Sequence, residues 1–205
     1  MLSRITHLHS LRNTSNHYTC GMTTFRSGNG AAWLDLLSTR EGRYREAVRH
    51  ADRISAPDTL LAWLAANDLE PTSAVTPDDV ELFGAVREAL HRAAVSALHH
   101  EPASAEDIRI LSGALGADRG VRIERAAAGL SLARPDTARE ALGRLTRAAV
   151  EDLAGPRSEQ LHACGDDTCA GIFFDPTGRR RWCTDQSCGN RLRVRAHRNR
   201  TRQSS

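Results

Sequence analysis

Apolar residues recur with a helical period along much of the first half of the chain. The clearest helix begins after Thr76, a residue suited to capping a helix, with Pro77 at the first helical position. Its apolar stripe consists of Val80, Phe83, Val86 and Leu90. Further helices are predicted from Ala31 onward, from Asp58 to Asn67 and from Ser104 to Gly116. This pattern predicts a mainly helical domain.

The period changes from helical to alternating between residues 121 and 133. Four aliphatic residues alternate there with polar ones: Val121, Ile123, Leu130 and Leu132. With Gly129 expected in the turn, this segment predicts a β-hairpin. A last long helix is predicted from about Asp136 to Leu153. The expected fold class is therefore α+β, with a mainly helical N-terminal domain over residues 29–156 that carries one β-hairpin.

The first 30 residues differ in composition from the rest of the chain. They contain no alanine, aspartate or glutamate, whereas residues 31–156 contain 27 alanines. They also lack a sustained period, so we expect residues 1–28 to form a disordered leader outside the fold. Met22 is a candidate for the true start of translation. An organellar transit peptide is the alternative, since the segment is free of acids, although its amphipathicity is poor.

Composition and charge indicate where a partner would bind. The chain has 205 residues, 40% of them hydrophobic and 26% charged, which suffices for one ordinary core and a small appended module. No apolar run is long enough to span a membrane and no signal peptide is recognisable, so we expect a soluble cytoplasmic protein. Residues 157–205 carry ten arginines and five acids, and the remainder has a net charge of −2. A basic C-terminal segment is typical of proteins that bind polyanions, although a solvated basic face is equally compatible with the charge alone.

Four of the five cysteines lie close together in this basic segment. They are Cys164, Cys169, Cys183 and Cys188, two pairs with the same four-residue gap. This spacing suits four thiolates around one tetrahedral Zn²⁺, whose binding supplies folding energy that so short a segment lacks. Two disulfides are the alternative, but they are disfavoured in a reducing cytosol. We therefore predict one structural zinc, with no open coordination position for a substrate.

The residues around the second cysteine pair predict a hairpin followed by a helix. Ile172, Phe173 and Phe174 precede a Pro-Gly turn, and a helix is expected to begin near Asp185 and to carry Cys188 in its first turns. A knuckle, a hairpin and a helix in this order suggest a small treble-clef-like zinc finger. We expect this finger, with a basic helix and tail, over residues 157–205.

Four arginines of the predicted helix share one face: Arg191, Arg195, Arg198 and Arg202. Leu192 and Ala196 share another face with Cys188 and are expected to pack inward. Arginine binds phosphate or guanine with two hydrogen bonds, so the arginine face is expected to contact double-stranded DNA. For Asn190 two roles are open, contact with adenine and hydrogen bonding within the helix start, of which the second is the commoner.

The string Cys-Gly-Asn-Arg at residues 188–191 closes a four-cysteine finger and resembles the CGNR zinc finger family. Proteins of that family carry an N-terminal ABATE domain, regarded as a stress-induced bacterial transcription regulator. Residues 33–39 resemble the opening motif of that domain, although Ser38 stands where the family usually has asparagine. The resemblance covers roughly residues 29–200. It implies DNA binding by the finger and a regulatory role for the helical domain.

Three classes of function follow from these observations. The first is a DNA-binding transcription regulator, in which two chains could pair because one finger offers few base contacts, and in which the helical domain could bind an unidentified small-molecule effector. The second is a zinc-finger module that binds a protein or RNA partner. In that case Phe173, Phe174 and Trp182 would stack on unpaired bases if they were exposed.

An enzyme is the third class, and we expect the chain not to be one. The helical segment contains no glycine-rich phosphate loop, no supported Ser-His-acid grouping and no histidine pair with metal spacing. His91, His99 and His100 fall on one predicted helix, where we expect an exposed polar face.

Overall fold

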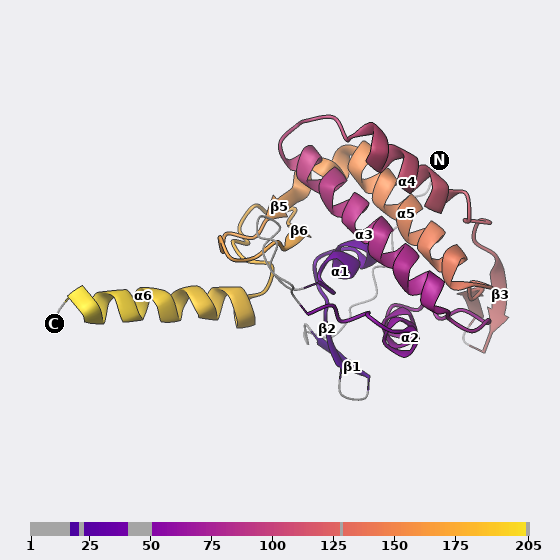
Figure 1. Cartoon of the computed structure of the whole chain (residues 1–205), viewed down its shortest axis with the longest axis horizontal. Helices are drawn as coiled ribbons and strands as arrows, with labels where there is room; N and C mark the ends of the chain where they lie inside the picture. Colours follow the sequence, from indigo (N-terminus) through magenta and orange to yellow (C-terminus); the bar gives the residue numbers. More distant parts are fainter. Residues whose placement is uncertain (1–16, 21–22, 41–50, 128, 204–205) are drawn as a thin grey trace, which may run out of the picture.

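The computed structural model describes residues 17–20, 23–40, 51–127 and 129–203 (Figure 1). Its helices are α1 (Ala32–Leu37), α2 (Pro57–Ala66), α3 (Pro77–Leu98), α4 (Ala105–Leu115), α5 (Ala138–Ala154) and α6 (Asn190–Gln203). Its strands form three antiparallel pairs: β1 (His17–Cys20) with β2 (Thr23–Arg26), β3 (Ile123–Ala126) with β4 (Gly129–Leu132), and β5 (Leu161–Ala163) with β6 (Ile172–Phe174). The predicted α+β class is confirmed.

Local capping interactions explain where the main helices begin. The hydroxyl of Thr76 accepts a hydrogen bond from the Asp79 amide at 3.3 Å, and the Asp79 carboxylate accepts one from the Thr76 amide at 2.9 Å. The hydroxyls of Ser104 and Thr137 accept hydrogen bonds from the amides of Asp107 and Glu140, and so cap α4 and α5. The helix starts predicted at Thr76 and Ser104 are therefore confirmed.

Helix α3 lies at the centre of the N-terminal body and packs against α1, α2, α4 and α5 (Figure 1). The largest side chains of the core are Trp33 from α1, Trp63 from α2 and Phe83 from α3, all fully buried. None of the described helices has the length and the apolar character that crossing a membrane requires. Burial of the aromatic and aliphatic faces of five helices thus stabilises the body.

The N-terminal segment enters the fold earlier than the sequence predicts. Strand β2 places Phe25 in the core, where it is 1% exposed, and Ser27 and Asn29 are also buried. Strand β1 pairs with β2 and contacts α2, so the prediction that residues 1–28 form a leader outside the fold is wrong for residues 17–20 and 23–28. Polar neighbours and the missing helical period concealed this strand. Met22 and residues 1–16 lie outside the described residues.

The predicted hairpin is present, but it differs in detail. Gly129, expected in the turn, is the first residue of β4 and pairs with Ala126, with a positive φ of 121° that suits glycine. The hairpin also protrudes from the body. Ile123 is 67% exposed and Leu130 is 80% exposed, so the alternating pattern does not mark a face buried in the chain's own core.

The C-terminal module packs directly on the helical body. Leu161, Ile172 and Phe174 of the β5–β6 hairpin belong to the same buried cluster as Trp33. The rings of Trp33 and Phe174 meet edge to face, with centroids 5.9 Å apart. The two parts of the chain therefore share one core at their junction.

Candidate metal centre and basic helix

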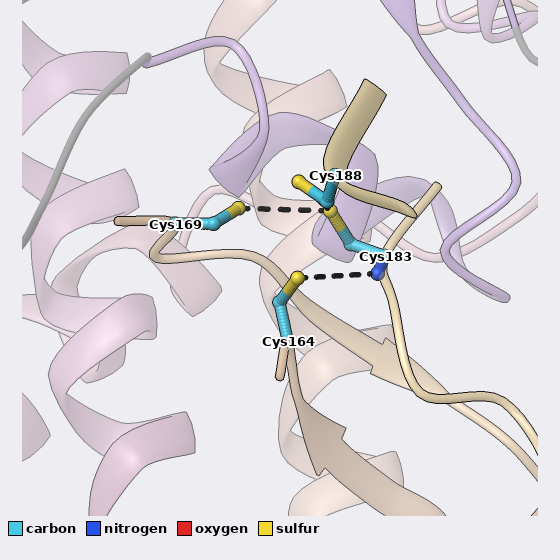
Figure 2. Close-up of side chains that lie close together, drawn as sticks. All are labelled: Cys164, Cys169, Cys183 and Cys188. Atoms are coloured by element: carbon cyan, nitrogen blue, oxygen red, sulfur yellow. Dashed lines mark hydrogen bonds between the residues drawn. The ribbon is translucent and has the colours of Figure 1, made fainter. Parts of the chain in front are cut away.

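The four clustered cysteines converge on one point (Figure 2). Their Sγ atoms all lie within 4.8 Å of one another. The Sγ atom of Cys183 is 3.6 Å from that of Cys169 and 3.5 Å from that of Cys188. Disulfides are excluded for these two pairs, because a disulfide requires about 2.05 Å.

These separations match those of a tetrahedral zinc site. Four sulfur ligands at about 2.3 Å from Zn²⁺ lie roughly 3.8 Å from one another. All four ligand positions of such an ion are filled by protein, so zinc here stabilises the finger and has no free position for an activated water. The cluster fits one structural zinc, as the sequence predicts.

Short turns bring the first cysteine pair into position. The Asp166 carboxylate accepts hydrogen bonds from the Thr168 amide at 3.0 Å and from the Thr168 hydroxyl at 2.7 Å. The Cys169 amide then donates to the Asp166 carbonyl at 2.8 Å. A β-carbon on Gly171 would lie 2.9 Å from the Cys183 sulfur, so only glycine fits there.

The second cysteine pair is held by a one-turn π-helix, Asp185–Gly189, that leads into α6. A β-carbon on Gly189 would clash with the Asp185 carboxylate and lie 3.0 Å from Cδ1 of Trp182, which explains the glycine of the Cys-Gly-Asn-Arg string. The amide of Gly171 donates to the Cys169 sulfur at 3.3 Å, and that of Cys183 donates to the Cys164 sulfur at 3.5 Å.

Hydrogen bonds among the four cysteines shift their pKa values in opposite directions. Bonds from the neighbouring cysteine thiols, together with the Arg191 guanidinium, hold the pKa of Cys188 far below its usual range. Hydrogen bonding with Cys169 lowers the pKa of Cys164 to about 7. Hydrogen bonding with Cys164 raises the pKa of Cys169 and of Cys183. Because thiolates are the metal-binding form of cysteine, zinc binding must displace protons from these two thiols.

The aromatic residues of the finger serve packing. Phe173 is fully buried against Cys183 and Cys188, and Phe174 is 5% exposed at the junction with the body. Trp182 is half-buried beside the cysteines, with the Arg181 guanidinium over its ring at 4.8 Å. The phenylalanines are therefore unavailable for stacking on unpaired bases.

Two arginines of the predicted DNA-binding face of α6 contact the finger itself. Arg191 forms an ion pair with the buried Asp166 at 2.7 Å and donates to the Cys188 sulfur at 3.1 Å. Arg195 approaches Asp166 at 3.4 Å and Asp167 at 3.2 Å. These two arginines brace the finger, and Asp166 is the residue that sequence reasoning missed. Its position between the first two cysteines, beside a basic helix, was the available signal.

The remaining part of α6 projects away from the body (Figure 1). Arg198 is exposed and forms no ion pair with any described residue, and Arg202 lies in the last turn. Ala196 is exposed and Leu192 only half-buried, so the expectation that both pack inward is wrong for Ala196. Asn190 begins α6 with an exposed side chain that makes no hydrogen bond to a described residue. Its expected role within the helix start is therefore not observed.

Residues 30–156 match the ABATE family, whose description is "Putative stress-induced transcription regulator". The chain belongs to the ABATE family. Residues 160–201, which contain the four cysteines and most of α6, match the CGNR zinc finger. No curated protein matches the chain.

Three successive backbone carbonyls accept hydrogen bonds from the finger and hold it against the ABATE domain. Gly28 accepts from Arg180, Asn29 accepts from the Phe174 amide, and Gly30 accepts from Arg157, at 2.7 to 2.9 Å. A β-carbon on Gly30, where φ is 97°, would lie 2.9 Å from Cβ of Phe174. This segment, residues 28–30, therefore fixes the orientation of the finger on the ABATE domain.

A buried histidine of the ABATE domain also contacts the finger. His91 is 3% exposed, and its Nε2 atom lies 3.4 Å from the Ala170 carbonyl oxygen. Burial lowers the pKa of His91 to about 3, so the imidazole is neutral near pH 7. The expected exposed face is therefore wrong for His91, while His99 and His100 are exposed.

Asp35 of α1 supports residues 28–30 and makes stability depend on pH. It accepts hydrogen bonds from the Asn29 amide at 3.1 Å and from Asn29 Nδ2 at 2.8 Å. Burial raises the pKa of Asp35 to about 6, although the hydrogen bonds from Asn29 act to lower it. The folded chain thus binds a proton more tightly than the unfolded chain, so stability falls as pH rises from about 4 to 6, by about 3 kcal/mol.

Replacing Asp35 by asparagine is expected to remove this dependence. The free energy of unfolding of the wild type, relative to Asp35→Asn, should decrease between pH 4 and pH 6 and then stay constant. Urea unfolding at a series of pH values measures it. A difference that does not change over this range would contradict the assignment.

Proposed function

We propose that this ABATE protein is a transcription regulator that binds double-stranded DNA through α6 of its CGNR finger. The observation that carries the proposal is the shape and charge of α6, which extends away from the body and contains six arginines and no acid. A basic helix that projects in this way can approach the phosphate backbone of a duplex. Zinc is structural in this proposal, and the chain has no catalytic role.

The pairing pattern divides the arginines of α6 by distance from the finger. Arg191 and Arg195 are held by Asp166, and Arg193 is held by Asp185 at 3.0 Å. Arg198 and Arg202 lie beyond these acids, in the projecting half of the helix. The first group orients the helix, and the second group contacts phosphate. Asn190, exposed where α6 leaves the finger, is the candidate for contact with a base edge.

Replacement of Arg198 and Arg202 by alanine tests this division. If each contacts one phosphate, the slope of log affinity against log salt concentration should fall by roughly 2, and all duplex sequences should bind more weakly alike. Fluorescence anisotropy with labelled duplexes at several salt concentrations measures both effects. The matched control is Arg109→Ala with Arg119→Ala, which removes the same charge from exposed positions of the ABATE domain.

The control variant should retain the wild-type slope. If the α6 variant keeps wild-type duplex affinity and slope while its zinc content and fold are intact, DNA is not the partner of α6. Binding of a protein or an RNA would then be tested in its place. A small-molecule effector of the ABATE domain stays a prediction of the sequence.

A further inference from the structure

Most of the large exposed apolar side chains gather at two places in the ABATE domain. Among the described residues eight such side chains are exposed, and six of them belong to these two places. Four lie on the β3–β4 hairpin, with exposed fractions from 44% to 80%: Val121, Ile123, Leu130 and Leu132. The other two are Ile108 of α4 and Val150 of α5. Concentration of this kind is typical of an interaction surface.

The hairpin residues form one convex apolar face. Ile123 and Leu132 pair directly across the two strands, and Arg125 pairs with Leu130. Paired residues point to the same face of a two-stranded sheet, and residues two positions apart along a strand share that face. Val121 extends this face at the base of the hairpin.

Ile108 and Val150 line a concave apolar groove. The groove lies between α4 and the ends of α3 and α5 and encloses about 400 Å³. Its apolar wall includes Ala97, Leu111, Leu115 and Leu153. Glu101 is the one charged residue among those that line it.

We propose that the hairpin of one chain fills this groove in a second copy, and that the second copy returns the same contact. In a dimer with twofold symmetry, the hairpin of each chain lies in the groove of the other chain. A single partner therefore covers both apolar surfaces of each chain. The hairpin does not fill the groove of its own chain. β4 ends at Leu132, shortly before α5 begins at Ala138, whereas the groove reaches the last turn of α5, about 25 Å away along this 17-residue helix.

The charges of the hairpin and of the groove also favour a second copy of this chain as the occupant of the groove. Arg125 lies on the apolar face of the hairpin, and Glu101 lies on the groove. Both are exposed, and neither side chain forms an ion pair with a described residue. Seating the hairpin in the groove brings one arginine toward one glutamate at each of the two contacts, which fixes the register of the pair.

The position of the hairpin leaves the finger accessible. β3 and α6 lie at opposite ends of the molecule (Figure 1). The hairpin therefore lies far from the basic helix of its own chain. The inference goes beyond DNA binding and does not depend on it.

Sedimentation velocity of the full zinc-loaded chain, without DNA, tests the pairing. The wild type should form a concentration-dependent dimer. Leu130→Arg on the hairpin and Ile108→Arg in the groove should each raise its dissociation constant by at least about 30-fold, as expected for the centre of an interface. The matched control is Leu61→Arg, at an aliphatic position of α2 that is 37% exposed, and it should leave the dimer unchanged. Thermal melts confirm that each variant is folded.

Charge reversal tests the register separately. Arg125→Glu should weaken the dimer, and combining it with Glu101→Arg should restore the wild-type dissociation constant. A wild-type chain that sediments as a monomer at every concentration overturns the inference. So does a dimer that responds to Leu130→Arg but not to Ile108→Arg, because the hairpins would then meet each other. Either result leaves the DNA-binding proposal standing, since DNA is absent from this experiment.

Discussion

Replacing Cys183 by serine is expected to abolish zinc binding and unfold the finger. Cys183 is 2% exposed, and its sulfur lies closest to those of Cys169 and Cys188. The variant would leave three cysteines close together without the cation that neutralises their thiolates. Binding of a structural zinc contributes roughly 10–16 kcal/mol in small fingers, which is comparable to the whole stability of an ordinary domain.

Metal analysis and circular dichroism measure the outcome. The wild type should contain one zinc per chain, and Cys183→Ser should contain none and lose the structure of the finger. Cys20→Ser is the matched control, because Cys20 belongs to β1 and not to the four-cysteine cluster, and it should retain one zinc. A Cys183→Ser chain with full zinc and an intact finger would show that the ligand set is wrong.

Replacing Phe174 by alanine is expected to separate the finger from the ABATE domain. Its ring contacts Trp33 edge to face, the Arg157 guanidinium lies 4.1 Å from its centroid, and Gly30 packs against its β-carbon. Loss of a buried phenylalanine costs about 3–5 kcal/mol, through lost burial and the cavity that remains. Since this side chain joins two parts of the molecule, the single unfolding transition should split into two.

Differential scanning calorimetry with zinc analysis checks this expectation. Phe174→Ala should keep its zinc, because the ring does not contact the cysteines. Phe173→Ala is the informative comparison, since its ring packs against Cys183 and Cys188, and it should lose zinc more readily instead. If Phe174→Ala melted in one transition at the wild-type temperature, the shared core would not couple the two parts.

Local signals were sufficient for much of this structure. Thr76 and Ser104 mark helix starts because a cap acts within one turn of the chain. The equal gaps within the two cysteine pairs predicted the metal centre because four ligands of one ion need only short, similar turns. The glycine of the Cys-Gly-Asn-Arg string is likewise explained by its own neighbours, Asp185 and Trp182.

Contacts between distant parts of the chain decided the rest. Phe25 looks like part of an unstructured leader until the core buries it. Arg191 and Arg195 look like DNA contacts until the fold places Asp166 beside them, 25 and 29 residues away in sequence. The Trp33 indole donates to Asp152, 119 residues away in sequence, and the spacing of apolar residues along the chain cannot predict such a pair. The sequence by itself thus determined most of the helices, the β3–β4 hairpin and the zinc ligands, because those depend on nearby residues. Only the tertiary structure decided which arginines pair with the acids of the finger and how the finger is held, because burial and ion pairing depend on what the folded chain brings together.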